Sequence, residues 1–349
     1  MAEIKLNKNK TIGDYLNPYI VAELNTSHFG DLAIAKEMIE KAKECGCDCV
    51  KLQSWSSDSL YSKKFYEENK MAKRFFDKFS LASDQILELS KFSESIEIDI
   101  TSTPYSIEEA EFLVNEINVP FIKIASMEIN NYRYLSQLGN LQKPLVLSTG
   151  MSTIQEIENA VKIIEKTNNE KIIILHCVSI YPSIPEIINL QNIVGLRNSF
   201  PNYPIGFSDH TIGTNIPTSS VALGAALIEK HFTLNNEKIG FDNQMATEPE
   251  EMKNMVESCK KVYLSMGSEK RELSNEELTQ RIKMRRSLIS QRSLKKGHII
   301  TEKDILIKRP GDGIPPNDLE KIIGSKLLDD MDEETQFLWE KLDTNYKEN

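Results

Sequence analysis

The sequence predicts an α/β fold, a (β/α)8 TIM barrel followed by a small β-rich module. Eight short strand-like runs precede residue 234, and most are rich in Val, Ile and Leu, as expected of strands buried on both faces of a parallel sheet. Helical patterns separate these runs, and after residue 286 short β runs alternate with turns instead. The predicted strands are residues 19–25, 47–54, 96–103, 120–126, 144–149, 171–177, 204–210 and 226–232.

The segments between the predicted strands carry apolar residues at helical spacing. Residues 31–46 form one such pattern, which ends in a glycine, a residue that commonly terminates helices. Residues 106–118 begin with Ser106 and have Glu109 three positions on, which is the pattern of a capping box. Residues 152–166 repeat this arrangement. A helix after each strand builds the outer ring of a barrel.

The length of 349 residues fits one barrel of about 250 residues and a smaller module. We expect the barrel over residues 1–266, a charged linker over 267–285 and the β-rich module over 286–349. Residues 55–80 form a polar, aromatic-rich insertion after the second strand, either a lid over the barrel mouth or a surface excursion.

Composition limits the partners and the compartment. The net charge of −10 argues against binding to nucleic acid or to anionic lipid. No stretch approaches the ~20 apolar residues of a membrane helix, and the N-terminal residues lack the apolar core of a signal peptide. Three of the five cysteines lie in the run CGCDC, too close together to pair with one another. We therefore expect reduced thiols and a cytoplasmic protein.

Basic residues gather between residues 281 and 309, in a chain that is acidic overall. Such a run is commonly a solvated face. It is also where a residue that binds an anionic substrate could come from.

Two histidines stand at the ends of two consecutive predicted strands. His210 closes PIGFSDH and His231 follows ALIEK, 21 residues further on. If the two strands are parallel neighbours, the imidazoles lie side by side at the carboxyl ends, where barrels carry their active sites. Two neutral imidazoles with open positions are typical of a catalytic divalent-metal site, although a histidine at a strand end can also be purely structural.

Two lysines, Lys51 and Lys123, lie inside otherwise apolar strands. An ammonium group is costly to bury without an anion, so these lysines indicate a site for phosphate or carboxylate. The alternative is that each lysine pairs with a barrel glutamate such as Glu23 or Glu229. The hydroxyl groups expected to join the lysines are those of Thr103, Ser126 and Ser208.

Eight motifs occur in the order seen in sialic acid synthases, and the chain resembles that family over nearly its whole length. The resemblance implies a metal-dependent barrel followed by an antifreeze-like (SAF) β-clip domain, in a domain-swapped homodimer. It implies condensation of phosphoenolpyruvate with N-acetylmannosamine or a 2,4-diacetamido-6-deoxyhexose to a nine-carbon 2-keto sugar acid, with release of phosphate. The motifs are KLQSWSSDSL, ITSTPYS, IKIASMEINN, LSTGM, HCVSIYP, GFSDHT, ALIEKHFT and KRPGDGI.

The resemblance also assigns roles to individual residues. His210 and His231 become ligands of a divalent metal, usually Mn²⁺, with Mg²⁺ or Co²⁺ as substitutes. Glu23 or Glu128 becomes the general acid or base. The implied phosphoenolpyruvate contacts are Lys51, Thr103, Lys123, Ser126, Ser179, Tyr181 and Ser208. The residues implied around the sugar are Glu23, Gln53, Tyr105, Glu128, Asp242 and Arg309.

The sequence leaves the sugar open. ELNTSHFG replaces the usual E-I-G-x-N-H-x-G, and Ser179 replaces a frequent Asn, and both departures favour the pseudaminic acid branch. GFDNQM and RPGDGI instead resemble the sialic and legionaminic branches.

Two other functions compete with this hypothesis. A related enzyme that condenses phosphoenolpyruvate with a sugar phosphate is disfavoured by the C-terminal module. A non-catalytic sugar-binding or ice-binding protein is disfavoured by the intact ring of polar residues at the strand ends.

Overall fold

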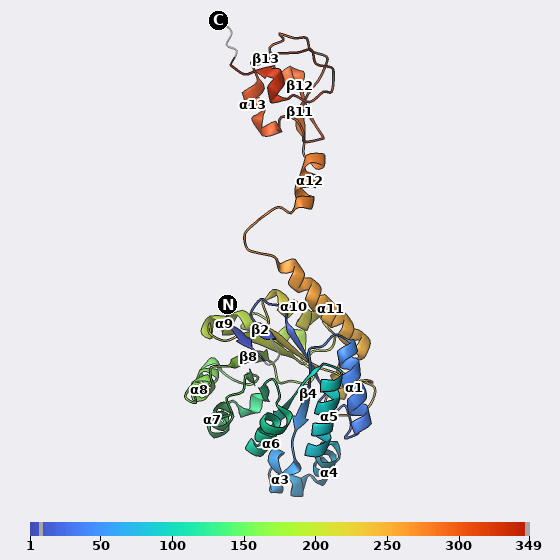
Figure 1. The fold of residues 1–349 in the computed structure, drawn as a ribbon, viewed down its shortest axis with the longest axis vertical. Helices are drawn as coiled ribbons and strands as arrows, with labels where there is room; N and C mark the ends of the chain where they lie inside the picture. Colours follow the sequence, from blue (N-terminus) through green and yellow to red (C-terminus); the bar gives the residue numbers. More distant parts are fainter. Residues whose placement is uncertain (7–9, 346–349) are drawn as a thin grey trace. The chain divides into compact units, whose positions relative to one another are not determined.

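The computed structural model describes residues 1–6 and 10–345, and the chain forms two compact units, Met1–Gly267 and Ser268–Asn349 (Figure 1). Each unit has a buried apolar cluster of its own.

The first unit is built on a sheet of eight parallel strands, which confirms the predicted fold class. The strand order is β5-β4-β3-β10-β9-β8-β7-β6, so β5 and β6 are the two edges of a nearly closed barrel. The Thr101 hydroxyl bridges these edges by donating to the Phe121 carbonyl at 2.5 Å. The strands are β3 (Tyr19–Glu23), β4 (Cys49–Ser54), β5 (Asp99–Pro104), β6 (Ile122–Ile124), β7 (Leu145–Ser148), β8 (Ile172–Cys177), β9 (Ile205–Asp209) and β10 (Leu227–His231).

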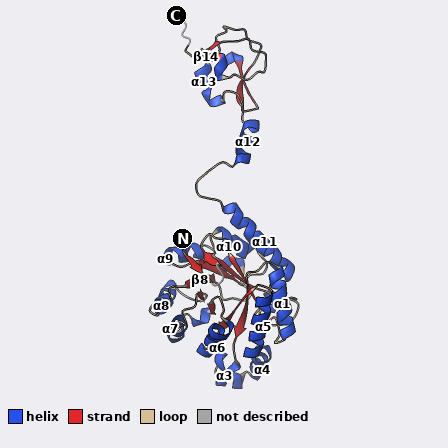
Figure 2. Cartoon of the chain, in the orientation of Figure 1, coloured by secondary structure: helices blue, strands red, loops and turns tan. Residues whose placement is uncertain are grey.

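Helices cover the outside of this sheet (Figure 2). The predicted capping box at Ser106 and Glu109 is confirmed, and Thr153 and Glu156 form another. The segment 106–118 is not one regular helix, because α6 passes into a π-helical turn at Leu113–Ile117. The outer helices are α1 (Leu32–Glu44), α5 (Ser83–Ser95), α6 (Ile107–Phe112), α7 (Tyr132–Asn140), α8 (Ile154–Glu165), α9 (Asn192–Ser199), α10 (Asn215–Ala222) and α11 (Pro249–Met266).

A hairpin that the sequence did not predict closes one end of the barrel. Its strands are β1 (Glu3–Lys5) and β2 (Thr11–Gly13). Ile4 and Ile12 belong to a buried cluster with residues at the starts of the barrel strands, among them Tyr19. The hairpin thus seals the end opposite the carboxyl ends of the strands.

The insertion after β4 folds into three short helices, α2 (Ser57–Leu60), α3 (Lys63–Glu68) and α4 (Lys70–Phe79). A separate apolar cluster that includes Trp55 and Phe76 supports these helices. The insertion is therefore a packed element rather than an irregular loop.

The second unit is β-rich, as predicted, and small antiparallel sheets surround a core that includes Leu288 and Phe337. The expected linker contains a helix, α12 (Asn275–Met284), whose first turn is capped by the Ser274 hydroxyl. The remaining elements are β11 (Ser287–Ser290), β12 (Ile305–Lys308), α13 (Leu319–Ile322), β13 (Lys326–Leu327) and β14 (Leu342–Asp343). Across both units, the described helices include none with the length and hydropathy needed to span a bilayer.

Candidate active site

A cavity of about 350 Å³ opens at the carboxyl ends of the barrel strands, within the size range of small-molecule sites. Each of the eight strands contributes to its wall, from the strand itself or from the loop that follows. The lining residues are Glu23, Lys51, Gln53, Thr103, Tyr105, Lys123, Ala125, Ser126, Met127, Ser148, Met151, Cys177, Ser179, Tyr181, Ser208, His210, Glu229, His231 and Asp242.

Side-chain alternation explains which residues of β9 and β10 reach the cavity. Successive residues of a strand point to opposite faces. Ser208 and His210 line the cavity, as do Glu229 and His231 one strand further on. The intervening residues of both strands point the other way, toward the helices.

The predicted histidine pair is present, with ring centroids 5.5 Å apart. The His210 Nδ1 lies 2.7 Å from the Val178 carbonyl, which can only accept, so this nitrogen carries a proton. Burial would lower the pKa of His210, but its contacts with the Cys177 thiol and the Val178 carbonyl raise it. Burial, reinforced by the charges of His210 and Lys51, holds the pKa of His231 well below its usual value, so this imidazole is neutral.

The donor set fits a divalent metal with open positions. The part of the chain that the structure describes contains no group of three or more His, Cys, Asp and Glu side chains that could hold a metal. A closed structural zinc site needs four ligands from the protein, whereas a catalytic site leaves positions for water and substrate. The cavity offers two histidines, one protein ligand fewer than a typical catalytic zinc site, so a divalent metal held here would take its other ligands from water and substrate.

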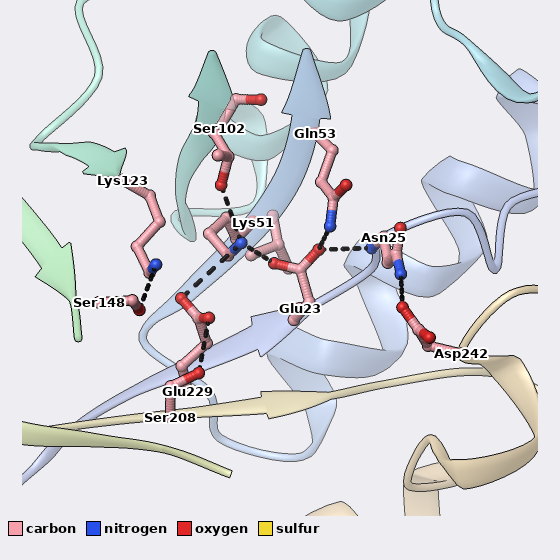
Figure 3. Close-up of polar contacts among 12 residues, drawn as sticks. Glu23, Asn25, Lys51, Gln53, Ser102, Lys123, Ser148, Ser208, Glu229 and Asp242 are labelled. Carbon is pink, nitrogen blue, oxygen red and sulfur yellow. Dashed lines mark hydrogen bonds and ion pairs between the residues drawn. The ribbon is translucent and has the colours of Figure 1, made fainter. Parts of the chain in front are cut away.

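Lys51 joins two buried carboxylates at the floor of the cavity (Figure 3). Its Nζ forms an ion pair with Glu23 and donates to the Thr103 hydroxyl at 3.0 Å. A second carboxylate oxygen, from Glu229, lies 3.8 Å away. The alternative in which this lysine pairs with barrel glutamates is therefore realised here.

The two carboxylates have pKa values shifted in opposite directions. Burial raises the pKa of Glu23 to about 7, although the charge of Lys51 opposes the shift. Burial would also raise the pKa of Glu229, but the charges of Lys123 and Lys51 hold it below its usual value. One carboxylate thus stays ionised while the other can exchange a proton near neutral pH.

Lys123 is a buried cation without a carboxylate partner among the described residues. It is buried, and its Nζ donates to the Ser148 hydroxyl at 2.6 Å and to the Ile124 carbonyl at 3.0 Å. Among the described residues, no carboxylate lies within ion-pair distance of this ammonium group. Burial lowers the pKa of Lys123, which is the cost of an uncompensated charge. An anionic ligand would remove that cost.

The polar groups beyond the two lysines are neutral or acidic. The Gln53 side chain donates to Glu23 at 3.4 Å and accepts from the Tyr105 hydroxyl at 3.2 Å. The Asp242 carboxylate accepts from the Asn25 amide at 2.5 Å (Figure 3). Asn25 lies in the motif that departs from the family pattern and was not singled out from the sequence.

The cavity brings together all but two of the site residues expected from the sequence. Glu128 is buried in a 3-10 turn, Ser126–Glu128, and its carboxylate accepts from the Asn131 amide at 2.7 Å. It is not among the residues that line the cavity. Arg309 is exposed in the second unit, directly after β12.

The site assignment from the sequence gave no role to the lining residues Ser148 and Cys177, and it gave Glu229 only as a possible partner of a buried lysine. The signal for Glu229 was its place two residues before His231, on the same face of the same strand. Met127 and Met151 also line the wall, from the loops after β6 and β7, and carried no chemical signal.

Known proteins share this architecture and much of this sequence. Residues 38–271 match the NeuB family, and residues 285–343 match the SAF domain. The N,N'-diacetyllegionaminic acid synthase of Legionella pneumophila is 34% identical over 352 residues, with 97% of this chain and 98% of that protein covered. The human N-acetylneuraminate-9-phosphate synthase is 32% identical over 355 residues, covering 99% and 98%.

A solved structure supports the same relationship. The N-acetylneuraminic acid synthetase of Leptospira borgpetersenii, in complex with citrate, superposes with a TM-score of 0.73 at 33% identity. The match covers 80% of this chain and 94% of that one.

Proposed function

The chain belongs to the NeuB family of sialic-type acid synthases, which condense phosphoenolpyruvate with an amino sugar, and we propose that its second substrate is an unphosphorylated N-acetylamino hexose. The product is then a nine-carbon 2-keto sugar acid, and phosphate is released. The single observation that carries the anionic half of this proposal is Lys123, a buried ammonium group in the cavity with no carboxylate at ion-pair distance among the described residues.

Phosphoenolpyruvate suits the basic side of the cavity. Its carboxylate and phosphate groups need cations and hydroxyl donors, and charge-assisted hydrogen bonds are the strongest of these contacts. Lys51 and Lys123 supply the charges. The residues proposed to supply the remaining contacts are Thr103, Ser126, Ser179, Tyr181 and Ser208, all of which line the cavity.

The acidic side of the cavity supports a sugar without a phosphate group. Of the described residues that line the cavity, Lys51 and Lys123 are the cations, and both are assigned to phosphoenolpyruvate. Gln53, Tyr105 and Asp242 remain for the sugar, and the Asp242 carboxylate would repel a sugar phosphate. We therefore favour N-acetylmannosamine or a 2,4-diacetamido-6-deoxyhexose.

We assign His210 and His231 as the protein ligands of a divalent cation, with Mn²⁺ preferred and Mg²⁺ or Co²⁺ as substitutes. When bound, such an ion supplies Lewis-acid polarisation of the sugar's aldehyde oxygen. The protein contributes a neutral His231 and a His210 ring whose Nδ1–H is fixed on Val178.

The charged cluster accounts for the remaining chemistry. Lys51 and Lys123 hold phosphoenolpyruvate so that its carbon 3 faces the aldehyde carbon. A carbon–carbon bond forms between them as the aldehyde C=O π bond breaks, and the aldehyde oxygen takes the electron pair and accepts a proton. Positive charge develops at carbon 2, near the ionised Glu229. Water then adds to carbon 2 and gives its proton to Glu23, and the tetrahedral intermediate expels phosphate by cleavage of its C–O bond.

We further propose a domain-swapped homodimer in which the SAF domain of one protomer carries Arg309 to the cavity of the other. Exposed apolar side chains on the loops after β6, β7, β8 and β9 support an interface around the cavity mouth, since such residues mark binding surfaces. They are Met127, Met151, Ile180 and Ile212. We also place the protein in the cytoplasm, a proposal supported by five cysteines that are all buried and free.

Phosphate release tests the proposal directly. The purified protein is incubated with phosphoenolpyruvate, Mn²⁺ and a panel of 2-acetamido and 2,4-diacetamido hexoses, each with and without a 6-phosphate group. We expect sugar-dependent phosphate release with an unphosphorylated member, and label in the bridging oxygen of phosphoenolpyruvate should appear in the phosphate. Faster turnover of a 6-phosphate would contradict the assigned sugar class, and no sugar-dependent release with any member would contradict the function.

A further inference from the structure

A fully buried ion pair lies behind the two histidines, on the helix-facing side of the barrel. Lys230 and Asp209 have no solvent-exposed side-chain surface, and the Lys230 Nζ lies 2.6 Å from Asp209 Oδ2. We propose that this pair positions His210 and His231 for metal binding. The inference rests on the proposed function, because it concerns the same histidines.

The sheet register places the pair directly against the histidines. Lys230 and Asp209 are opposite each other in the ladder between β10 and β9. Each is the residue immediately before one of the histidines. Since successive side chains alternate, the ion pair and the two imidazoles occupy opposite faces of the same two strands.

The pair contacts the chain on both sides of His210, at Asp209 before it and at Thr211 after it. The Lys230 ammonium group also donates to the Thr211 carbonyl. The Asp209 carboxylate accepts from the Thr211 amide at 3.1 Å and from the Thr211 hydroxyl at 3.0 Å. One ammonium group therefore ties β10, just before His231, to the residues that precede and follow His210.

Stability alone does not explain the pair. The strands are already joined by a backbone ladder, and a buried ion pair is often no more stabilising than apolar residues of similar volume. A directed contact between two charges does, however, fix the relative position of the strands at one point. Groups that hydrogen-bond to metal ligands commonly change metal affinity 10–100-fold when they are replaced. The ion pair holds the backbone on either side of the ligands instead of the rings, and we expect its loss to weaken metal binding in the same direction.

The test compares Mn²⁺ affinity in two variants that each lose one ion pair of the barrel, fully buried at Lys230 and partly buried at Arg197. Lys230→Met removes the proposed positioning contact. Arg197→Met is the matched control, because Arg197 pairs with Asp14 at 3.3 Å close to the hairpin that closes the far end of the barrel. Isothermal titration with MnCl₂ alone measures affinity without turnover, and thermal unfolding reports any loss of stability.

We expect Lys230→Met to weaken Mn²⁺ binding at least tenfold. The Mn²⁺ affinity of Arg197→Met should stay within about twofold of wild type, even if its Tm falls by as much as that of Lys230→Met. If Lys230→Met does not fold, the double variant Asp209→Leu/Lys230→Met, which removes both charges at once, takes the place of the single variant in the test. Wild-type affinity in a folded variant that lacks Lys230 would overturn the inference.

A structural measurement separates this inference from the metal assignment. If the wild type itself binds no Mn²⁺, the proposed metal site is wrong. The distance between the His210 and His231 rings in crystals of the double variant then decides the positioning role without any metal. Rings that keep their wild-type distance, 5.5 Å between centroids here, would overturn it.

Discussion

Two carboxylates and two ammonium groups share the buried floor of the cavity, and their arrangement determines which group can move a proton. Lys51 lies between Glu23 and Glu229, whereas Lys123 is held by a hydroxyl and a carbonyl. The pKa of Glu23 is raised to about 7 and that of Glu229 is lowered. When the surroundings of two neighbouring carboxylates shift their pKa values apart, the two groups usually take different acid–base roles in catalysis.

A pair of matched variants tests which glutamate exchanges the proton. We expect Glu23→Gln to lower kcat by about 100-fold or more, because general acid–base catalysis contributes factors of this order. Glu128→Gln should reduce kcat much less, since its carboxylate accepts from Asn131 and does not line the cavity. Steady-state kinetics with saturating phosphoenolpyruvate would measure both, and the reverse order of effects would assign the role to Glu128.

Lys123→Met should abolish tight phosphoenolpyruvate binding and leave the fold intact. Hydrogen bonds to charged groups contribute about 1.5–3 kcal/mol, so the KM for phosphoenolpyruvate should rise at least tenfold. The apoprotein should unfold at the same or a higher temperature, because the variant no longer buries an uncompensated charge. The exposed Lys162 on α8 provides the control substitution to Met. An unchanged KM in Lys123→Met would refute its assignment.

At the scale of single elements, the insertion helices hold one wall of the site. Phe241, in the long segment after β10, stacks on Phe76 of α4 with ring centroids 5.2 Å apart and meets Phe75 edge-on at 4.2 Å. The next residue is Asp242, which lines the cavity. The insertion, expected from the sequence as a lid or a surface excursion, is thus packed against the segment that presents this carboxylate.

We therefore expect Phe241→Ala to raise the KM for the sugar about tenfold, since each aromatic contact contributes about 0.5–1.5 kcal/mol. The KM for phosphoenolpyruvate should change far less, because Lys51 and Lys123 lie on other strands. Phe241→Tyr keeps the ring and should behave as wild type. Equal changes in both KM values would show that Phe241 supports the whole barrel instead.

In the second unit, a buried carboxylate organises the turn before β12. Asp304 accepts from the His298 ring at 2.8 Å, from the Arg292 guanidinium at 2.8 Å and from the Thr301 hydroxyl at 2.8 Å. Burial would raise the pKa of Asp304, but these hydrogen bonds outweigh it and hold the pKa well below the usual range.

The sign of this shift gives a pH prediction. A lowered pKa in the folded state stabilises the unit above the unfolded pKa of about 4, and this stability is lost as the pH falls toward the folded value. Asp304→Asn should lower the free energy of unfolding of the second unit by about 2 kcal/mol at pH 7. The variant should not show the further loss of stability that the wild type shows below pH 4. Urea unfolding followed by Trp339 fluorescence in a Trp55→Phe background measures the second unit. Parallel pH profiles for both proteins would exclude Asp304 as the cause.

For the whole molecule, the sequence predicts the barrel strands well, but it does not predict the N-terminal hairpin or the turn after β6. The runs of Val, Ile and Leu reveal most of the strands, because a strand buried on both faces is mainly apolar. The hairpin of β1 and β2 has no such signal, since it is short and has one buried face. The position of Glu128 was equally hidden, because a 3-10 turn after β6 removes it from the alternation that identifies strand residues.

Complementation in trans tests the proposed dimer. Arg309→Ala and His231→Ala homodimers should each be nearly inactive. Unfolded together, mixed in equal amounts and refolded, they should form heterodimers in which one barrel with intact histidines meets one SAF domain with Arg309. Random pairing restores about a quarter of the wild-type sites. If the mixture stays inactive while wild type refolds well, Arg309 acts within its own chain or not at all.

The place of β10 in the sheet has a consequence for how the protein is made. This strand pairs with β3, near the start of the chain, in a register that sets Leu227 against Tyr19. On the ribosome, β3 therefore lacks one neighbour until nearly the whole barrel has been synthesised. The same strand carries Glu229, Lys230 and His231. Barrel closure and assembly of the histidine pair are thus one event, and a nascent chain that stops before β10 has neither.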